Sequence, residues 1–145
     1  MLILSIDLGI VKKHAYMIAQ VENKVNIISI ESVENILDLK PQLKKVNIVI
    51  VEKPYYFKNV KVYGDFWYLI GRLSVLCENY GNTLVLVRPY DWKNKLKLTA
   101  KQSKEERQKN TNAILKHYSL NGKELTEDEV TAVLIGHYYI KYLND

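Results

Sequence analysis

Residues 46–52 read VNIVIVE, a run of mostly β-branched apolar residues that ends in an acid. Such residues favour strands, and a strand that is apolar at nearly every position is typical of one covered on both faces of its sheet. Residues 1–7 read MLILSID, a second short apolar run that also ends in an acid. If these two strands are neighbours, Asp7 and Glu52 lie side by side at one end of the sheet.

Further strands and helices are expected around this pair. Residues 14–21 and 25–30 are apolar runs separated by a polar turn, which predicts an antiparallel meander that begins with residues 1–7. Another buried strand is expected at residues 83–87, closed by Pro89. The expected helices are a short one within residues 32–43, limited by Pro41, and longer ones over residues 63–80, 101–118 and 126–143.

This order of elements predicts an α/β fold. Three strands come first, and the later strands are connected through helices, so the sheet is expected to be mixed. It has five strands, an antiparallel meander of the first three plus parallel strands, and helices flank it. No internal repeat or linker interrupts the chain, which predicts one domain over residues 1–145.

The composition excludes several classes of protein. With 48% hydrophobic and 26% charged residues, the 145-residue chain is neither disordered nor collagen-like. Its one cysteine, Cys77, excludes a disulfide framework and a cysteine-rich zinc site. No apolar run approaches the roughly 18 residues of a membrane span, and no leader pattern opens the chain. We therefore expect a protein that acts away from membranes, in the cytoplasm.

Charge is unevenly distributed along the chain. The net charge is +5, and seven basic residues fall within residues 93–109, where only Glu105 and Glu106 oppose them. Residues 124–129 are mostly acidic instead. Separate basic and acidic regions are what a metal-dependent enzyme acting on a polyanion needs, and a solvated lysine-rich face gives the same pattern.

A third acid is a candidate partner of the two at the strand ends. Asp128 lies in the first turn of the last helix, which opens with the capping-box pair Thr126 and Glu129. Hard divalent cations prefer carboxylate oxygens, and two such ions roughly 4 Å apart promote attack of water on a phosphodiester. Taken singly, Asp7 and Glu52 also suit exposed strand ends, and Asp128 suits the positive end of a helix dipole.

These segments together resemble RuvC-like Holliday junction resolvases, within the RNase H-like (retroviral integrase) superfamily. The resemblance lies in LILSIDLGIVKKHAYMI at residues 2–18, VIVEKPYY at 49–56, RPYDWKNKLKLTAKQSKEERQ at 88–108 and EDEVTAVLIGHYYI at 127–140. It implies an RNase H-like fold with Asp7 and Glu52 as the first two metal ligands. It also implies that Tyr55 intrudes at the junction crossover, and that Lys93 and Lys104 contact the scissile phosphate.

The match is incomplete in the last helix. The family helix typically reads Asp-x-x-Asp-Ala; Asp128 fits the first acid, but Thr131 stands at the second. Threonine offers a neutral oxygen and no charge, so a second ion would be held more weakly. Three explanations stay open: Glu127 or Glu129 supplies the fourth ligand, three acids suffice, or the protein binds without cutting.

The resemblance implies a crossover junction endodeoxyribonuclease that resolves four-way DNA junctions. It would use Mg²⁺, replaceable by Mn²⁺, with two ions per active site, and a metal-activated water would make paired symmetric nicks. A homodimer is implied, with the helix over residues 63–80 as the expected interface, and the small size would suit a phage or viral enzyme acting in host cytoplasm. The rival hypotheses are a nuclease of this fold that acts on forked DNA or RNA–DNA hybrid, and a non-catalytic junction-binding protein.

Several basic and aromatic residues are candidates for DNA binding. The aromatic residues at 55–57 stand among lysines, a combination in which rings stack on bases and ammonium groups bind phosphates. By contrast, Trp92 is expected to anchor its loop, and His137 to be a satisfied core histidine. The predicted DNA-binding residues are Lys53, Tyr55, Tyr56, Phe57, Lys58, Lys61, Lys93, Lys95, Lys97, Lys101, Lys104 and Arg107.

Overall fold

The computed structural model describes residues 1–54 and 59–144. The strands are β1 (Leu2–Asp7), β2 (His14–Val21), β3 (Val25–Val33), β4 (Ile48–Glu52) and β5 (Thr83–Val87). The helices are η1 (Ile36–Leu39), α1 (Lys40–Leu43), α2 (Val60–Tyr80), α3 (Pro89–Lys95), α4 (Lys104–His117), α5 (Glu127–Tyr138) and the π-helical turn η2 (Tyr139–Leu143). Within these described ranges, no helix is both long and apolar enough to cross a membrane.

The strands form one mixed sheet in the order β3-β2-β1-β4-β5. β1 and β3 each run antiparallel to β2, whereas β4 runs parallel to both β1 and β5. The predicted five-stranded sheet is therefore confirmed. In the register, Ile6 pairs with Val51, so Asp7 and Glu52 both follow at the same end of two adjacent strands.

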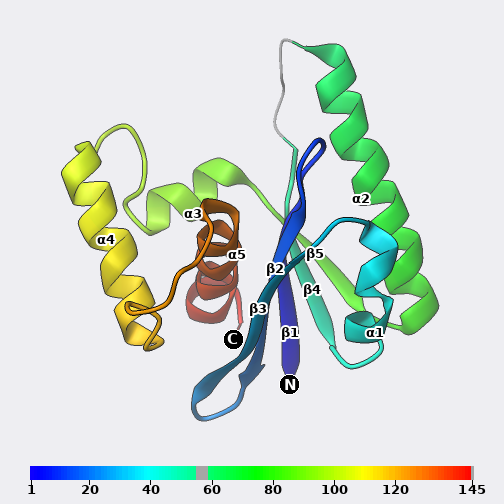
Figure 1. Ribbon diagram of the computed structural model, residues 1–145, viewed down its shortest axis with the longest axis horizontal. Helices are drawn as coiled ribbons and strands as arrows, with labels where there is room; N and C mark the ends of the chain where they lie inside the picture. The colour runs from blue at the N-terminus through cyan, green and yellow to red at the C-terminus, as the bar shows by residue number, and fades with distance from the viewer. Residues whose placement is uncertain (55–58, 145) are drawn as a thin grey trace.

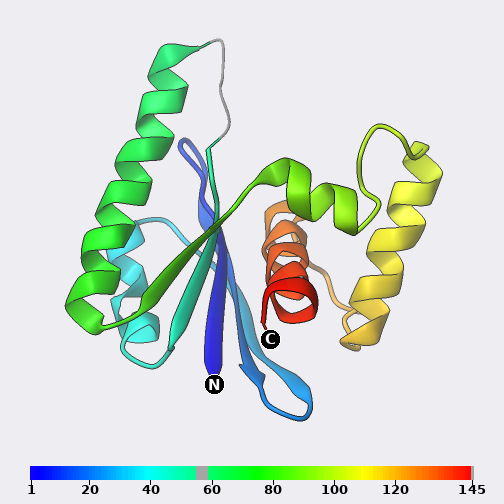
Figure 2. The same cartoon turned by 180° about the vertical axis from the view of Figure 1, so that it is seen from behind.

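Helices cover both faces of the sheet. In both views, α1 and α2 lie on one side, and α3, α4 and α5 lie on the other (Figures 1 and 2). Alternate residues of β1 face the two cores: Leu4 and Ile6 pack with α2, and Ile3 packs with α5. This alternation buries an apolar surface on each face, so both helical layers hold the strand ends in place.

α5 approaches β1 more closely than most side chains would allow. A Cβ atom at Gly136 would lie 2.7 Å from Ser5 Oγ and would also collide with Met17. The Ser5 hydroxyl donates a hydrogen bond to the Ala132 carbonyl at 2.7 Å, which links strand to helix within the core. This close packing fixes α5 against β1 and so places the first turn of α5 beside the end of that strand.

Several sequence-based boundaries differ from the structure; α2 begins at residue 60 and not at 63, and α4 begins at residue 104 and not at 101. β3 extends to Val33, and the helix expected from residue 32 begins at Ile36, because the Asn35 side chain accepts a hydrogen bond from the Leu37 amide and starts the turn there. Pro41 does not limit this segment but lies in the first turn of α1, where proline is tolerated. Pro89 does close β5, but it also opens α3, a helix that was not predicted.

Candidate active site at one end of the sheet

The three predicted acids converge at one end of the sheet, uppermost in Figure 1. Asp7 ends β1, Glu52 ends β4, and Asp128 is the second residue of α5. α5 begins there because its capping box closes: Thr126 Oγ1 accepts from the Glu129 amide at 3.1 Å, and the Glu129 carboxylate accepts from the Thr126 amide at 2.9 Å. The structure thus brings together acids that lie more than 40 residues apart in sequence.

Asp7 is the most strongly perturbed of these acids. Burial raises its pKa to about 7, and repulsion from the Asp128 carboxylate adds to the effect, with a smaller contribution from Glu52. The Lys12 ammonium group opposes this rise, whereas a hydrogen bond between the two aspartates favours the protonated acid. Asp7 is therefore about half protonated near neutral pH in the absence of a metal ion, because burial and the neighbouring Asp128 both disfavour its charged form.

Lys12 supplies the positive charge nearest to this cluster. Its Nζ lies 2.5 Å from Asp128 Oδ1, and that hydrogen bond raises the pKa of the lysine. The turn carrying it is tight: the Gly9 amide donates to His14 Nδ1 at 3.1 Å, and a Cβ at Gly9 would lie 2.6 Å from Lys12 Cγ. Sequence reasoning missed this residue, although the pair Lys12 and Lys13 stands in the turn that follows the strand-end acid Asp7.

Glu52 is held by a buried indole. Trp92 is 3% exposed, and its Nε1 donates to Glu52 Oε2 at 2.6 Å. Burial raises the pKa of Glu52, while this hydrogen bond and the charge of Lys93 oppose the rise. Trp92 is thus an anchor as expected, but it lies in α3 and its partner is a candidate metal ligand. A buried tryptophan needs an acceptor for its N–H, and the sequence did not identify which one.

The donor chemistry of the site fits a hard divalent cation. All three acids offer carboxylate oxygens, and a bound cation would offset the burial and the repulsion from Asp128 that disfavour the charged form of Asp7. Among the described residues, however, no group of three or more His, Cys, Asp or Glu side chains is arranged to hold a metal ion as it stands. The three acids are neighbours, but their carboxylates are not arranged around one position that an ion could occupy.

The candidates for a fourth ligand differ in how far they are already engaged. Glu129 is committed to the helix cap through its bond to the Thr126 amide. The Thr131 hydroxyl donates to the Glu127 carbonyl at 3.1 Å within the helix, which leaves its lone pairs free to accept. The Glu127 charge acts on Lys12 and so lies on the side of α5 that faces the cluster.

Of the predicted basic residues, Lys53 and Lys93 lie with the acids. Lys53 directly follows Glu52, and its amide donates to the Val87 carbonyl at 2.7 Å, which extends the pairing of β4 with β5. Lys93 Nζ lies 5.4 Å from the centroid of the Trp92 ring. Lys53 is therefore next to Glu52 along the chain, and the charge of Lys93 acts on the Glu52 carboxylate.

The other predicted DNA-binding residues lie farther along the surface. Lys61 pairs with Asp65 at the start of α2, and Lys95 lies over the Tyr142 ring. Lys104 and Arg107 belong to α4, which lies outside α3 and α5 in both views (Figures 1 and 2). Lys97 and Lys101 lie in the connection from α3 to α4. Tyr55, Tyr56, Phe57 and Lys58 lie outside the described residues.

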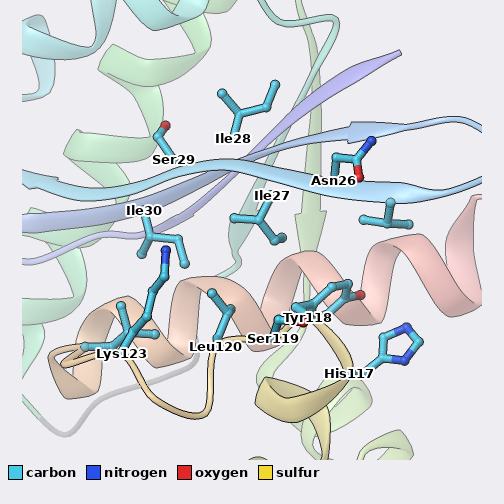
Figure 3. A pocket seen from close by; sticks show the side chains of 12 residues that line it. Asn26, Ile27, Ile28, Ser29, Ile30, His117, Tyr118, Ser119, Leu120 and Lys123 are labelled. Carbon is cyan, nitrogen blue, oxygen red and sulfur yellow. The ribbon is translucent and has the colours of Figure 1, made fainter.

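A separate cavity of about 460 Å³ lies between β3 and the connection from α4 to α5. Ile27 and Ile30 point into it from the strand toward Tyr118 and Leu120 (Figure 3). None of the described residues that line it is acidic, so it offers no carboxylate ligand for a metal. Nearby, His137 is buried and its Nδ1 lies 2.6 Å from the Tyr118 hydroxyl, as expected for a satisfied core histidine.

Comparison with known proteins finds relatives by structure alone. No protein-family model and no curated protein sequence matches the chain. RuvC of Thermus thermophilus superimposes with a TM-score of 0.73 at 15% identity, over 96% of this chain and 95% of that one. The fowlpox virus resolvase, solved with Holliday junction DNA, gives 0.65 at 20% identity over 100% of both chains.

A mitochondrial enzyme shares the fold as well. The yeast mitochondrial Holliday junction resolvase gives a TM-score of 0.59 at 17% identity, over 95% of this chain and 77% of that one. The chain is therefore structurally similar to RuvC and to viral and mitochondrial junction resolvases over nearly its whole length, and it has the RNase H-like fold seen in RuvC. At these identities the likeness establishes the fold, and function has to be argued from the site.

Proposed function

We propose that this chain is a metal-dependent endodeoxyribonuclease that resolves four-way DNA junctions by paired nicks. The observation that carries the proposal is the convergence of Asp7, Glu52 and Asp128 at one end of a sheet whose fold is shared with junction resolvases. Three neighbouring carboxylates, beside Lys53 and Lys93, suit a reaction between a metal-bound water and a phosphodiester.

In the proposed mechanism, the carboxylate oxygens of Asp7, Glu52 and Asp128 would hold the Mg²⁺. The bound metal, as one ion or a pair, supplies an activated water and stabilises the leaving oxygen. Trp92 fixes the Glu52 carboxylate through its 2.6 Å hydrogen bond, so this ligand is oriented before the substrate arrives. Lys93 is placed to offset negative charge that develops on the phosphate.

Lys12 has a second role in this proposal. In the metal-free protein its ammonium group neutralises part of the Asp128 charge. If Asp128 serves as a metal ligand, Lys12 would give up this ion pair, and its side chain, which is 54% exposed, would turn toward solvent. Lys12 then lies at the rim of the site, where it can meet a DNA phosphate.

A homodimer follows from the need to cut two strands. The exposed side of α2 carries Tyr68 and Val75, which are 66% and 56% exposed, and with Leu37 they border an apolar groove of about 440 Å³. Pairing two copies through this face would bury it and supply one active site for each strand. Light scattering should give twice the mass of the chain, and Tyr68→Lys should return the protein to a monomer.

Two observations favour the non-catalytic alternative. Thr131 brings no charge to the position where the resolvase pattern has an acid, and the acids are not closed around a point. A protein of this kind would bind junctions in EDTA and cut none.

A nuclease specific for forked DNA or RNA–DNA hybrid would keep the same acids and differ only in its substrate.

Cleavage of a labelled mobile four-way junction tests the proposal. Fork, duplex and RNA–DNA hybrid serve as matched substrates, each with Mg²⁺, Mn²⁺ or EDTA. Paired nicks on the junction that require metal would support a resolvase. Cutting of the hybrid or the fork in preference would keep the chemistry and replace the substrate, and tight binding without cutting in either metal would leave a junction-binding protein.

A further inference from the structure

A pocket of about 430 Å³ lies beside Glu52, where β4 and β5 end. The β4–β5 register pairs Glu52 with Val87, so the residues that follow these two, Lys53 and Arg88, emerge side by side. α3 starts there and closes the third side. We call this the Tyr90 pocket; it is lined by Lys53, Pro54, Arg88, Pro89, Tyr90 and Lys93.

The walls of the Tyr90 pocket suit a flat aromatic group. Two proline rings and the ring of Tyr90 give it apolar surfaces, and the tyrosine remains 63% exposed although it stands beside a cavity. An exposed tyrosine ring offers a stacking face for a nucleobase of any kind. The apolar stems of the lysines and the arginine complete the wall, with their charged ends at the rim.

The rim of the pocket is cationic. Lys53, Arg88 and Lys93 contribute three positive charges. Among the described residues, Asp91 is the one acid that forms an ion pair with a cation of this rim. Asp91 binds the Arg88 guanidinium through two hydrogen bonds, at 2.8 and 3.2 Å, and so holds it in a fixed direction. An apolar slot ringed by cations matches a base with phosphates on either side.

The pocket is coupled directly to the candidate active site. Trp92 lies between Tyr90 and Lys93 in sequence, and its indole donates to Glu52. Lys93, which lines the pocket, also interacts with both members of this pair. Its Nζ lies over the Trp92 ring, and its charge acts on the Glu52 carboxylate. A nucleotide in the pocket would therefore be the direct neighbour of a phosphate at the acids.

We propose that the Tyr90 pocket takes an unstacked base adjacent to the scissile phosphate and so gives cleavage a preference for bases that leave the DNA stack readily. The inference rests on the proposed function, because it assumes that a DNA phosphate lies at Glu52. Stacking on Tyr90 holds the base, and the three cations hold the phosphates that flank it. Bases then differ in rate of cleavage according to how well they leave the DNA stack and fill this slot.

The test begins with mapping the nicks that the wild-type protein makes in the junction with Mg²⁺. The fluorescent base 2-aminopurine is then placed on either side of the mapped cut. Binding is followed with Asp7→Asn, which keeps the pocket and lacks one proposed metal ligand, so that the DNA stays intact. We expect the fluorescence to change on binding, because the base leaves its stack. Adding Tyr90→Ala should abolish this change and weaken binding roughly 5- to 150-fold.

Matched variants separate stacking from structural damage. Tyr90→Phe keeps the ring and should preserve the fluorescence change and the sequence preference of cleavage. Ile28→Ala removes an exposed side chain of β3, the edge strand opposite β5, and should leave both unchanged. Cleavage of junctions that carry each of the four bases at the cut should show a preference in the wild type that Tyr90→Ala flattens.

The outcomes distinguish this inference from the proposed function. If the wild type nicks the junction, but the fluorescence does not respond and Tyr90→Ala keeps the sequence preference, the pocket assignment is overturned and the nuclease assignment stands. If the wild type cuts in neither Mg²⁺ nor Mn²⁺, the proposed function is overturned and this inference with it.

Discussion

Replacing Asp7 with asparagine should stabilise the metal-free protein at alkaline pH. In the folded chain the pKa of Asp7 is about 7, against an ordinary value of 3.8, because the acid is buried next to Asp128. The folded state therefore binds this proton more tightly than the unfolded state does. The contribution of Asp7 to the free energy of unfolding is greatest at low pH. It is lost as the pH rises from about 4 to about 7, and it does not change further above that pH.

The size of the effect follows from the same values. At 1.36 kcal/mol per pH unit, a pKa moved from 3.8 to about 7 corresponds to roughly 4 kcal/mol. Asp7 keeps partial contact with solvent, which screens the interaction, so we expect about 2 kcal/mol. Asparagine has the shape of the protonated acid and carries no charge. Asp7→Asn should thus exceed the wild type by about 2 kcal/mol at pH 8 and match it at pH 4.

Urea denaturation in EDTA, followed by circular dichroism at both pH values, measures this difference. The matched control is Asp65→Asn, an exposed aspartate paired with Lys61 on α2, which should lose no more than about 0.5 kcal/mol at either pH. Adding Mg²⁺ should stabilise the wild type and leave Asp7→Asn nearly unchanged. A variant that is folded but no more stable than the wild type at pH 8 would refute the claim that the ionised Asp7 carboxylate destabilises the folded protein.

Three further changes test other parts of the site. Trp92→Phe removes the donor to Glu52 and should cost about 1 to 3 kcal/mol in urea denaturation at pH 8, together with a higher Mg²⁺ requirement for cleavage. Lys12→Met removes the cation that competes for Asp128, so calorimetric titration should show tighter Mn²⁺ binding; weaker binding would contradict this role. Gly136→Ala should lower the melting temperature, at a cost of about 1 to 3 kcal/mol, because its Cβ would meet Ser5 and Met17; an unchanged melting temperature would contradict the close packing of α5 on β1.

The sheet and its acids could be predicted because they depend on patterns that the sequence displays directly. Unbroken apolar runs such as 46–52 mark buried strands, and a strand-end acid is visible as soon as its strand is located. Asp128 followed from a capping box, which is also local. Adjacent strands then bring Asp7 and Glu52 to the same end through the register alone.

What the sequence did not predict depends on contacts between distant segments. Nothing local in PYDWKNK indicates that Trp92 reaches Glu52 across 40 positions, and Pro89 was taken as the end of a strand although it also begins a helix. Lys12 reaches Asp128 only because the turn after β1 meets the first turn of α5. Lys104 matched by spacing, and spacing alone does not show that α4, which carries it, lies on the outer side of α5 (Figure 1).

The most direct test of the central claim is the rate of a single turnover on a four-way junction, with nicks mapped on all four strands. The wild type should make paired nicks at symmetric positions in Mg²⁺ and in Mn²⁺, none in EDTA, and Asp7→Asn should make none in either metal while still binding the junction. Cutting that persists in EDTA or in Asp7→Asn would contradict a metal site at these acids. No cutting by the wild type in either metal would contradict the assignment as a nuclease.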